Sequence, residues 1–416
     1  MPSSEPIFSA VSSNAHNLYT LLQCIGFAPK ATVQITPDGI RFSAEESRVV
    51  QGLAFLDKAL FTSYTFNPPL DPNHEPLHDE NAGAEDPDAT YYPCFMVSLT
   101  ALLETLKIFG VNDPSPSTAL AGSGPSNRAP SAQPSSSAFN APALLLDRSC
   151  TLQYLQDGSP LSITLSETGV KTTCDLTTYE PDAFTAADAD ADIPLQRDAI
   201  AMKVIMRSAW LHNAISELSG TNPTVLRLSA SATEEPYFSL TGIGGPFSES
   251  SVEFSIEQHT TPGTTTTTTT QNQTQQSHHK TLTDDGTARA RATRSKLAPT
   301  VTETFLVSPP SSMGNRLRQD YKFALVQKAA RAMAVANKVS IRGDRQGVLS
   351  LQFMVEFDAL GVVHSSFSNT SSSHATGGGG GGQRQTGNHT VSFVDFRFVP
   401  LLDEESLELE ENGGFE

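Results

Sequence analysis

The sequence repeats one order of strands and helices, and this repeat constrains the fold more than any other feature. The first half opens with a short apolar strand at 7–11, a helical pattern from Asn14, and an alternating strand meander across 31–66. A second strand and helix follow at 94–110, and the order begins again at 199 after an acidic connector. Two similar halves of mixed strands and helices predict an α+β protein with antiparallel sheets.

The segment at 321–357 carries strand and helix periods in one stretch and contains no catalytic constellation. Its first residues, 321–325, alternate apolar and polar side chains and predict a half-buried strand. A short helix is expected next, with three residues facing the sheet: Val326, Ala330 and Met333. Lys328 and Arg331 lie three apart and therefore share another face of this helix. A strand, a turn at 343–347 and a second strand complete a surface that suits a negatively charged partner.

The polar residues of the chain are concentrated in a few segments. Hydrophobic residues make up 38% of the 416 residues, below the roughly 45–50% of an average globular chain. Three segments are rich in Ser, Thr, Pro, Gln or Gly: 113–140, 260–300 and 366–390. We expect these to be disordered insertions, and the remainder is long enough for two hydrophobic cores.

The net charge of −18 is concentrated in the segments 71–88, 180–198 and 403–416. Together they hold 20 of the 45 acidic residues and 1 of the 27 basic residues. The rest of the chain has 25 acidic against 26 basic residues, so it is close to neutral. An acidic composition therefore does not exclude a basic surface that contacts nucleic acid.

The four cysteines, Cys24, Cys94, Cys150 and Cys174, form no C-x-x-C pair and lie near no histidine at zinc-ligand spacing. Each lies in or beside an apolar run, which indicates buried free thiols and a reducing compartment. The N-terminus lacks the basic and apolar regions of a signal peptide, and no apolar run approaches the ~20 residues that span a membrane. We therefore expect no metal, no cofactor and no membrane association.

Several blocks of the sequence resemble DNA sliding clamps. The hairpin at 38–49 resembles the first-domain hairpin of clamps such as proliferating cell nuclear antigen. Further blocks resemble the Rad-one subunit family of the heterotrimeric nine-one-one checkpoint clamp: 98–110, 211–220 with 235–244, and 338–355. The resemblance covers a little over half of the chain, and the low-complexity insertions and the acidic tail have no counterpart.

The resemblance implies an α+β, PCNA-like DNA-clamp fold, with two similar domains that have outer antiparallel sheets and inner helices. It also implies a heterotrimeric ring with two other checkpoint-clamp subunits, loaded around double-stranded DNA by a checkpoint clamp loader in the nucleus. Such a ring recruits checkpoint-signalling and DNA-repair proteins. The parts expected in chain order are a first domain at 1–178 with an acidic loop at 67–93 and the insertion at 113–140, a connector at 179–198, a second domain at 199–402 with insertions at 260–300 and 366–390, and an acidic tail at 403–416.

The resemblance implies that the helix faces turned away from the sheets contact DNA, electrostatically and independently of its sequence. Arg331 matches a basic position of the family and is the first candidate. The other candidates are Lys328, His212, Lys107, Arg207 and His16. His212 stands where the family resemblance implies an arginine. For each of these residues the alternative is an ordinary solvated helix face.

Exposed sheet edges are templates for strand pairing, which makes them candidates for subunit interfaces. By resemblance the edges are 170–176 and 252–256, with these contact residues: Val170, Cys174, Leu176, Val252, Phe254 and Ile256. The alternative is an intramolecular strand capped by a loop. Phe184 and Ile193 lie in the connector, which resembles the region where clamps dock partner peptides, although a linker with no partner is the plain alternative.

Two other functions stay open at the level of the sequence. The family resemblance raises a 3′→5′ exonuclease, but metal-dependent nucleases need clustered carboxylates, and the acids here gather in loops and the tail. Asp38 and Asp344 are turn residues with a local reason for their positions, so we expect no catalytic residues. A homotrimeric replication clamp is the second alternative; the closer block matches and the long insertions stand against it. The basic run at 289–296 fits a nuclear-import signal, a phosphorylation target or a chance cluster in a polar linker.

Overall fold

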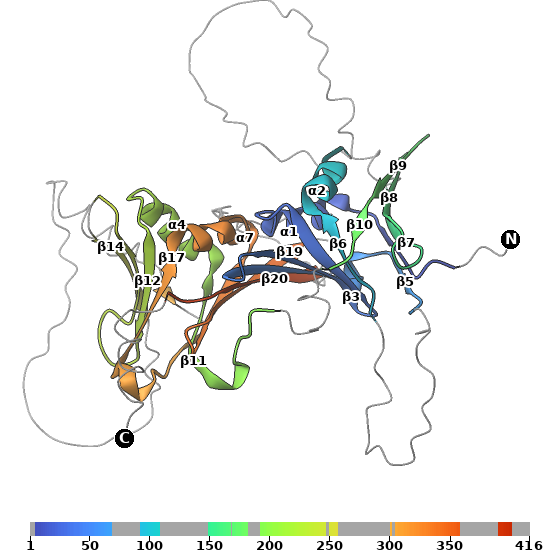
Figure 1. Ribbon diagram of the computed structural model, residues 1–416. Coiled ribbons are helices and arrows are strands. Elements are labelled where there is room, and N and C mark those ends of the chain that lie inside the picture. Colours follow the sequence, from blue (N-terminus) through green and yellow to red (C-terminus); the bar gives the residue numbers. More distant parts are fainter. Residues whose placement is uncertain are drawn as a thin grey trace, which may run out of the picture. The chain divides into compact units, whose positions relative to one another are not determined.

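The computed structural model describes residues 5–68, 92–108, 149–167, 169–181, 192–246, 249–256, 300–301, 304–357 and 390–401 (Figure 1). The chain divides into two compact units. Unit 1 comprises Met1–Leu195, Ala324–Val339 and Val348–Val399, and unit 2 comprises Gln196–Phe323, Ser340–Gly347 and Pro400–Glu416. These units follow spatial contacts rather than the internal repeat, so the domain boundaries expected from the sequence stay a prediction.

One sheet of unit 1 is antiparallel with the strand order β5-β1-β7-β8-β9. Its strands are β1 (Phe8–Ser12), β5 (Ser63–Phe66), β7 (Ser149–Tyr154), β8 (Leu161–Glu167) and β9 (Val170–Leu176). Alternate residues of β1 and β7 are buried, as expected for strands with one face on a core. β9 is the last strand of this sheet.

A second antiparallel series in unit 1 has the order β10-β6-β2-β3-β4-β20-β19. Its strands are β2 (Lys30–Thr36), β3 (Gly39–Glu46), β4 (Val50–Asp57), β6 (Cys94–Ser98), β10 (Thr178–Tyr179), β19 (Leu349–Phe357) and β20 (Thr390–Phe398). β20 pairs on both sides, with Val394 opposite Ala54 of β4 and Phe353 of β19. A strand from the end of the chain therefore completes the sheet begun by the first meander.

Helices of unit 1 lie on one face of this second sheet (Figure 1). α1 (Ala15–Cys24) packs on β4 and α7 (Ala330–Val335) packs on β19, while α2 (Leu99–Ile108) contacts β2 and β6. α1 also contacts both α2 and α7. The predicted N-cap is present, because the Asn14 side chain accepts a hydrogen bond from the His16 N–H at 3.0 Å. The three helices therefore form a layer over the sheet.

The helix of the 321–357 segment differs from the sequence prediction in its start and its phase. Strand β17 (Arg316–Lys322) ends before Phe323, where the helical run α6 (Phe323–Val326), η6 (Gln327–Ala329) and α7 begins. Apolar residues at 323 and 326 satisfy a strand alternation and a helical spacing at once, so the pattern misplaced the boundary. Val326 and Met333 are buried as predicted. Ala330 is only half-buried, because the tighter 3₁₀ turn shifts the buried face to neighbouring alanines, Ala329 and Ala332.

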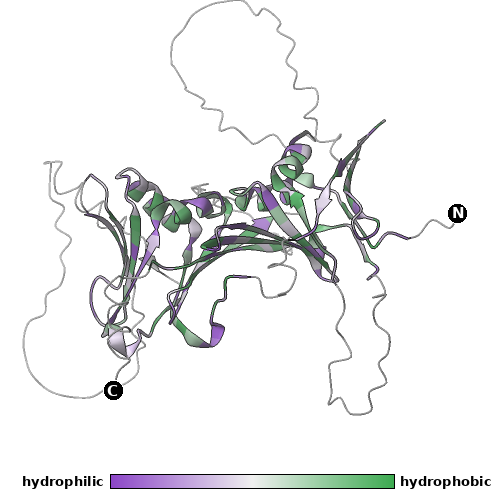
Figure 2. Cartoon of the chain, in the orientation of Figure 1, coloured by the Kyte–Doolittle hydropathy of each residue, from purple (hydrophilic) through white to green (hydrophobic). Residues whose placement is uncertain are grey.

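Unit 2 contains a sheet with the order β15-β14-β13-β12-β17 and the antiparallel pair β11–β16. Its strands besides β17 are β11 (Ile200–Arg207), β12 (Val225–Ser231), β13 (Phe238–Ile243), β14 (Glu249–Ile256), β15 (Thr300–Val301) and β16 (Thr304–Val307). Helix α4 (Ser208–Ser219) packs on β11, β13 and β14 through a buried face of Leu211, Ala214, Ile215 and Leu218. Hydrophobic and hydrophilic residues alternate along the strands of both units (Figure 2).

The predicted turn at 343–347 is built by Asp344. Its Oδ1 accepts the Gln346 N–H at 3.0 Å, and its carbonyl accepts the Gly347 N–H at 3.2 Å. Gly347 has a φ of +91° and its Cα faces the Pro400 ring, so a side chain would be strained there and would clash. The turn follows β18 (Lys338–Asp344), whose residues are divided between the two units.

Candidate DNA-facing helices and subunit edges

The two cations of the 321–357 helix are in different environments. Arg331 is exposed on α7, whereas only 23% of the Lys328 side chain is exposed. Lys328 Nζ lies 2.7 Å from Glu46 Oε2 and 5.4 Å from the centroid of the Phe27 ring. The charge of Lys328 is therefore offset within unit 1, and Arg331 is the more exposed of the two side chains.

Arg331 lies near the end of α1. Its positive charge acts on the Cys24 thiol, where it opposes the effect of burial. Burial is the stronger cause and raises the pKa of Cys24 to about 12, so this thiol stays protonated at neutral pH. The contact between α1 and α7 explains this proximity.

The candidates on α1 and α2 lie on the outer helix faces. Lys107 is exposed near the end of α2, with its Nζ 6.0 Å from the centroid of the Tyr19 ring. His16 is half-buried in the first turn of α1, and its Nε2 lies 3.4 Å from Thr20 Oγ1. Because α1 contacts both α2 and α7, one helical layer of unit 1 carries Lys107, His16 and Arg331.

The candidates on α4 belong to unit 2. Arg207 is exposed just before the helix, with its guanidinium 5.6 Å from the centroid of the Trp210 ring. His212 is half-buried, and its Nδ1 is buried without a hydrogen-bond partner in the described part of the chain. Helix α4 therefore offers less positive charge than α7.

Acidic residues lie on the same helices as the candidate cations. Glu104 of α2 and Glu217 of α4 are both exposed. Each reduces the local positive potential that Lys107 or Arg207 would offer to a phosphate. Their presence was readable in the sequence, at positions outside the apolar faces, and it lowers the expected strength of the DNA contacts.

The predicted edge strands have different neighbours. β9 ends its sheet, and Val170 is 63% exposed while Leu176 is buried and Cys174 half-buried. β14 is not the last strand, because the short β15 pairs in parallel with Ser255 and Ile256. The prediction that 252–256 forms an open edge is therefore wrong at Ile256.

The other two β14 candidates, Phe254 and Val252, differ in how deeply they are buried. Phe254 is buried against Phe238, with ring centroids 5.1 Å apart, so it is a core residue of unit 2. Val252 is half-buried and lies opposite Leu240. Of the three β14 residues, only Val252 is left partly exposed and uncovered by β15.

The end of the connector is anchored in unit 1. Ile193 is buried, its N–H donates to Gln51 Oε1 at 3.0 Å, and its carbonyl accepts from Arg397 Nη1 at 2.8 Å. Asp192 pairs with Arg41 and with Arg397. Ile193 is therefore a core side chain rather than an exposed docking residue, and Phe184 lies outside the described residues.

Buried thiols and acids give no reactive arrangement among the described residues. Burial raises the pKa of Cys150 to about 12 and also raises the pKa of Cys94. No group of three or more histidine, cysteine, aspartate or glutamate side chains in the described ranges has metal-binding geometry. Within the same ranges, no helix has both the length and the apolarity to cross a membrane.

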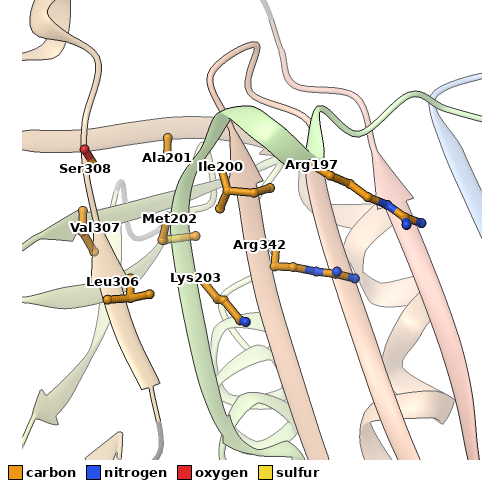
Figure 3. Close-up of a pocket in the computed structure, with 9 residues that line it drawn as sticks. All are labelled: Arg197, Ile200, Ala201, Met202, Lys203, Leu306, Val307, Ser308 and Arg342. Carbon is orange, nitrogen blue, oxygen red and sulfur yellow. The ribbon is translucent and has the colours of Figure 1, made fainter.

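A pocket of about 460 Å³ in unit 2 carries cations that were not among the predicted site residues (Figure 3). Its lining residues are Arg197, Ile200, Ala201, Met202, Lys203, Leu306, Val307, Ser308 and Arg342. These come from the turn before β11 and its first residues, from the end of β16 with the residue after it, and from β18. Arg342 lies more than a hundred residues from Arg197 and Lys203 in the sequence, so no local motif indicated that the three come together.

The family model described as repair protein Rad1/Rec1/Rad17 matches residues 7–355. The chain belongs to this family. The antiparallel sheets with their helical layer confirm the α+β class predicted from the sequence. The resemblance to the Rad-one family is confirmed as well.

Two relatives show the extent of the similarity. The DNA damage checkpoint control protein rad1 of Schizosaccharomyces pombe is 25% identical over 350 residues, which cover 84% of this chain and 81% of that protein. The cell cycle checkpoint protein RAD1 of Homo sapiens is 26% identical over 350 residues, which cover 84% of this chain and 86% of that protein. The similarity therefore spans most of both chains.

Two solved structures of proliferating cell nuclear antigen are similar to the chain at low sequence identity. The protein from Thermococcus kodakaraensis has a TM-score of 0.49 at 14% identity, covering 95% of this chain and all of that chain. The protein from Entamoeba histolytica has a TM-score of 0.48 at 10% identity, covering 96% and 100%.

Proposed function

We propose that this chain is one subunit of a heterotrimeric DNA-damage checkpoint clamp, a ring that encloses double-stranded DNA. The observation that carries the proposal is the family match across 7–355, together with relatives whose names assign them to DNA-damage and cell-cycle checkpoint control. A clamp holds DNA by topology, so it needs a closed ring more than it needs reactive side chains. We place the protein in the nucleus because its relatives are named for DNA-damage and cell-cycle checkpoint control.

Contact with DNA in this proposal is made by the helical layer. Arg331 and Lys107 are exposed on α7 and α2, and both can pair with backbone phosphates, which present the same charge at every base pair. Arg207 is the corresponding candidate beside α4. The exposed Glu104 and Glu217 weaken this attraction, which suits a ring that must move along DNA.

Assembly of the ring is proposed to use strand pairing at sheet edges. β9 is the stronger candidate, because it ends its sheet and its exposed residues include Val170. β14 is the weaker candidate, because β15 covers Ser255 and Ile256. The two other checkpoint-clamp subunits would each add a strand to one of these edges.

The ring is also proposed to be loaded by another protein and to recruit client proteins. A checkpoint clamp loader would open and close the ring at recessed DNA junctions, and the loaded ring would recruit signalling and repair proteins. The connector at 179–198 is the proposed docking region, although its last residues are fixed by Gln51 and Arg397. The domain division at 178 and 199 belongs to this same proposal.

Native mass spectrometry tests the subunit assignment. The chain alone is expected as a monomer, and the chain mixed with the two other checkpoint-clamp subunits is expected as a one-to-one-to-one trimer. A trimer formed by this chain alone would replace the proposal with a homotrimeric replication clamp. Incubating the assembled ring with a 3′-labelled duplex and Mg²⁺ or Mn²⁺ checks the exonuclease alternative, with no shortening expected.

A further inference from the structure

The pocket of unit 2 combines cations with an apolar wall. Lys203, Arg197 and Arg342 extend their side chains toward the same side of the view in Figure 3, each from a different segment. Leu306 is 62% exposed beside them, and Ile200, Met202 and Val307 extend the apolar surface. Among the lining residues there is no aspartate or glutamate. The pocket therefore suits an acidic segment that also carries apolar side chains.

The pocket also lies at the edge of a sheet. β16 is the last strand in the sheet order beside β11, and it contributes Leu306 and Val307 to the lining. An edge strand offers backbone groups that can pair with an added extended segment. A suitable occupant therefore needs acidic residues, apolar residues and an alternating pattern.

The acidic tail of the same chain has these three properties. Residues 403–416 hold seven acidic residues and no basic residue. Within them, Leu407-Glu408-Leu409-Glu410 alternates apolar and acidic side chains at the period of a strand. The charge of the tail is thus opposite to that of the pocket.

The tail also starts beside the pocket. Pro400 packs against Gly347, and the Leu401 N–H donates to the carbonyl of Asp320 at 2.8 Å. The turn that ends at Gly347 holds the segment that enters β11: the Gln196 N–H donates to Asp344 Oδ2 at 3.0 Å. One turn therefore contacts both the root of the tail and the strand entry that lines the pocket.

We propose that the acidic tail, residues 402–416, occupies the Arg197–Lys203–Arg342 pocket of its own chain. Fifteen residues span up to roughly 50 Å when extended, which is ample for a pocket within the same unit. The bound tail closes this basic surface to acidic segments of other proteins until one of them displaces it. The pocket is thereby a regulated docking site for acidic, leucine-bearing peptides.

Other acidic segments fit the pocket less well. In residues 71–88 the acids are interrupted by prolines rather than alternating with leucines. The connector acids at 182–190 alternate with alanine, which offers little apolar surface, and Asp192 is already paired in unit 1. The tail directly follows Pro400 and Leu401, which belong to unit 2.

Carbodiimide cross-linking of the purified full chain tests the proposal, because this reagent joins amines to carboxylates that are already paired. Lys203 is expected to couple to a glutamate of the tail, as read by mass spectrometry of the digest. The exposed pair Lys58–Asp38, with 2.9 Å between Nζ and Oδ1, is the positive control in the same molecule. A mixture of ¹⁴N- and ¹⁵N-labelled chains should give tail cross-links of a single isotope, which shows that they form within one chain.

Matched variants separate the pocket from general attraction between charges. Lys203→Arg keeps the charge but removes the amine, and should abolish this cross-link. Arg197→Glu with Arg342→Glu should remove most of it, as should replacing tail glutamates 404, 405, 408, 410 and 411 by glutamine. The Lys58–Asp38 product should persist in all variants.

Three results would overturn the proposal. The first is the absence of any Lys203–tail product when Lys58–Asp38 couples normally. The second is coupling of Lys203 to 71–88 or 182–190 as readily as to the tail. The third is a tail product found only as mixed isotopes, which would make the tail an occupant of another copy.

Discussion

Lys328 Nζ of the helical run lies 2.7 Å from Glu46 Oε2 at the end of β3, and both residues belong to unit 1. Lys328 is therefore paired with a carboxylate of the same unit. Arg331 stays exposed on the next turn. This difference decides how the two residues should contribute to DNA retention.

Arg331 is expected to contribute more to DNA binding than Lys328. The plot of log affinity against log salt has a negative slope. Arg331→Ala should make this slope shallower by about 1, as expected for the loss of one phosphate contact. Lys328→Ala should reduce the steepness of the salt dependence by less than half as much, because Glu46 already offsets the Lys328 charge. Affinity of the assembled ring for duplex DNA, measured across a salt series, provides the slopes.

The Glu46→Gln variant is the control for this comparison. Without the Glu46 carboxylate, Lys328→Ala should have a larger effect on the salt slope than it has in the native chain. Stability should change by no more than about 1 kcal/mol, since partly exposed pairs contribute about 0.2–1 kcal/mol. Equal slopes for Arg331→Ala and Lys328→Ala would contradict the assigned roles.

Asp192 is expected to fix the end of the connector. Its Oδ2 lies 3.4 Å from Arg397 Nη1, it pairs with Arg41, and its Oδ1 accepts from Gln51 Nε2 at 2.8 Å. Asp192→Asn leaves the partly buried Arg41 guanidinium without this carboxylate and leaves Arg397 with Asp395 alone, so the free energy of unfolding should fall by about 1–3 kcal/mol. Urea unfolding measures this loss. Asp198→Asn, at an exposed position nearby, should change stability by less than about 0.5 kcal/mol, and a similar loss there would argue against a specific anchor.

Stability should fall as the pH rises above 9. Burial raises the pKa values of Cys24 and Cys150 from 9.0 to about 12, so between these values the unfolded chain has lost thiol protons that the folded chain keeps. Fewer protons on the unfolded state make ΔG of unfolding decrease with pH, by up to about 1.4 kcal/mol per pH unit for each thiol. Urea unfolding between pH 8.5 and 10.5 tests this.

Variants assign that slope to the thiols. Cys24→Ala and Cys150→Ala should each flatten the decline. Leu22→Ala, which opens a cavity in α1 without removing a titrating group, should lower stability by the same amount at every pH. An unchanged slope in both cysteine variants would show that other groups cause the decline.

The outer edge of β9, which ends its sheet among the described residues, is expected to bind another subunit. Val170→Glu places a charge on a side chain that is 63% exposed, so folding should change by less than about 0.5 kcal/mol. Affinity for the two other checkpoint-clamp subunits should fall by about tenfold or more, a loss of about 1.4 kcal/mol. Leu155→Glu makes the same kind of change at an exposed leucine outside the strand and should leave assembly intact. If both variants assemble normally, β9 is not an interface.

The local features of the fold were predictable from the sequence. The Asn14 cap and the buried face of α4 follow from residue spacing and short-range hydrogen bonding. The strand–turn–strand at 338–357 follows from apolar runs on either side of a turn sequence. These features depend on residues close together in the chain, which is why their patterns survive in the sequence.

The features that depend on distant residues were not predictable. Nothing in the local sequence indicates that Val394 lies opposite Ala54, that Glu46 pairs with Lys328, or that β15 covers the end of β14. The start of the helix at Phe323 was missed because apolar residues there satisfy two periods at once. The family resemblance gave the likeness to a clamp, but it did not indicate that Glu46 offsets the charge of Lys328.

Retention on closed and open DNA tests the central claim most directly. The ring assembled from this chain and the two other checkpoint-clamp subunits is loaded with the clamp loader onto nicked circular DNA and washed at high salt. A clamp should remain on the circle and leave when one restriction cut linearises it, because only topology holds it there. Equal retention on circular and linearised DNA, or loss from both at high salt, would contradict the account.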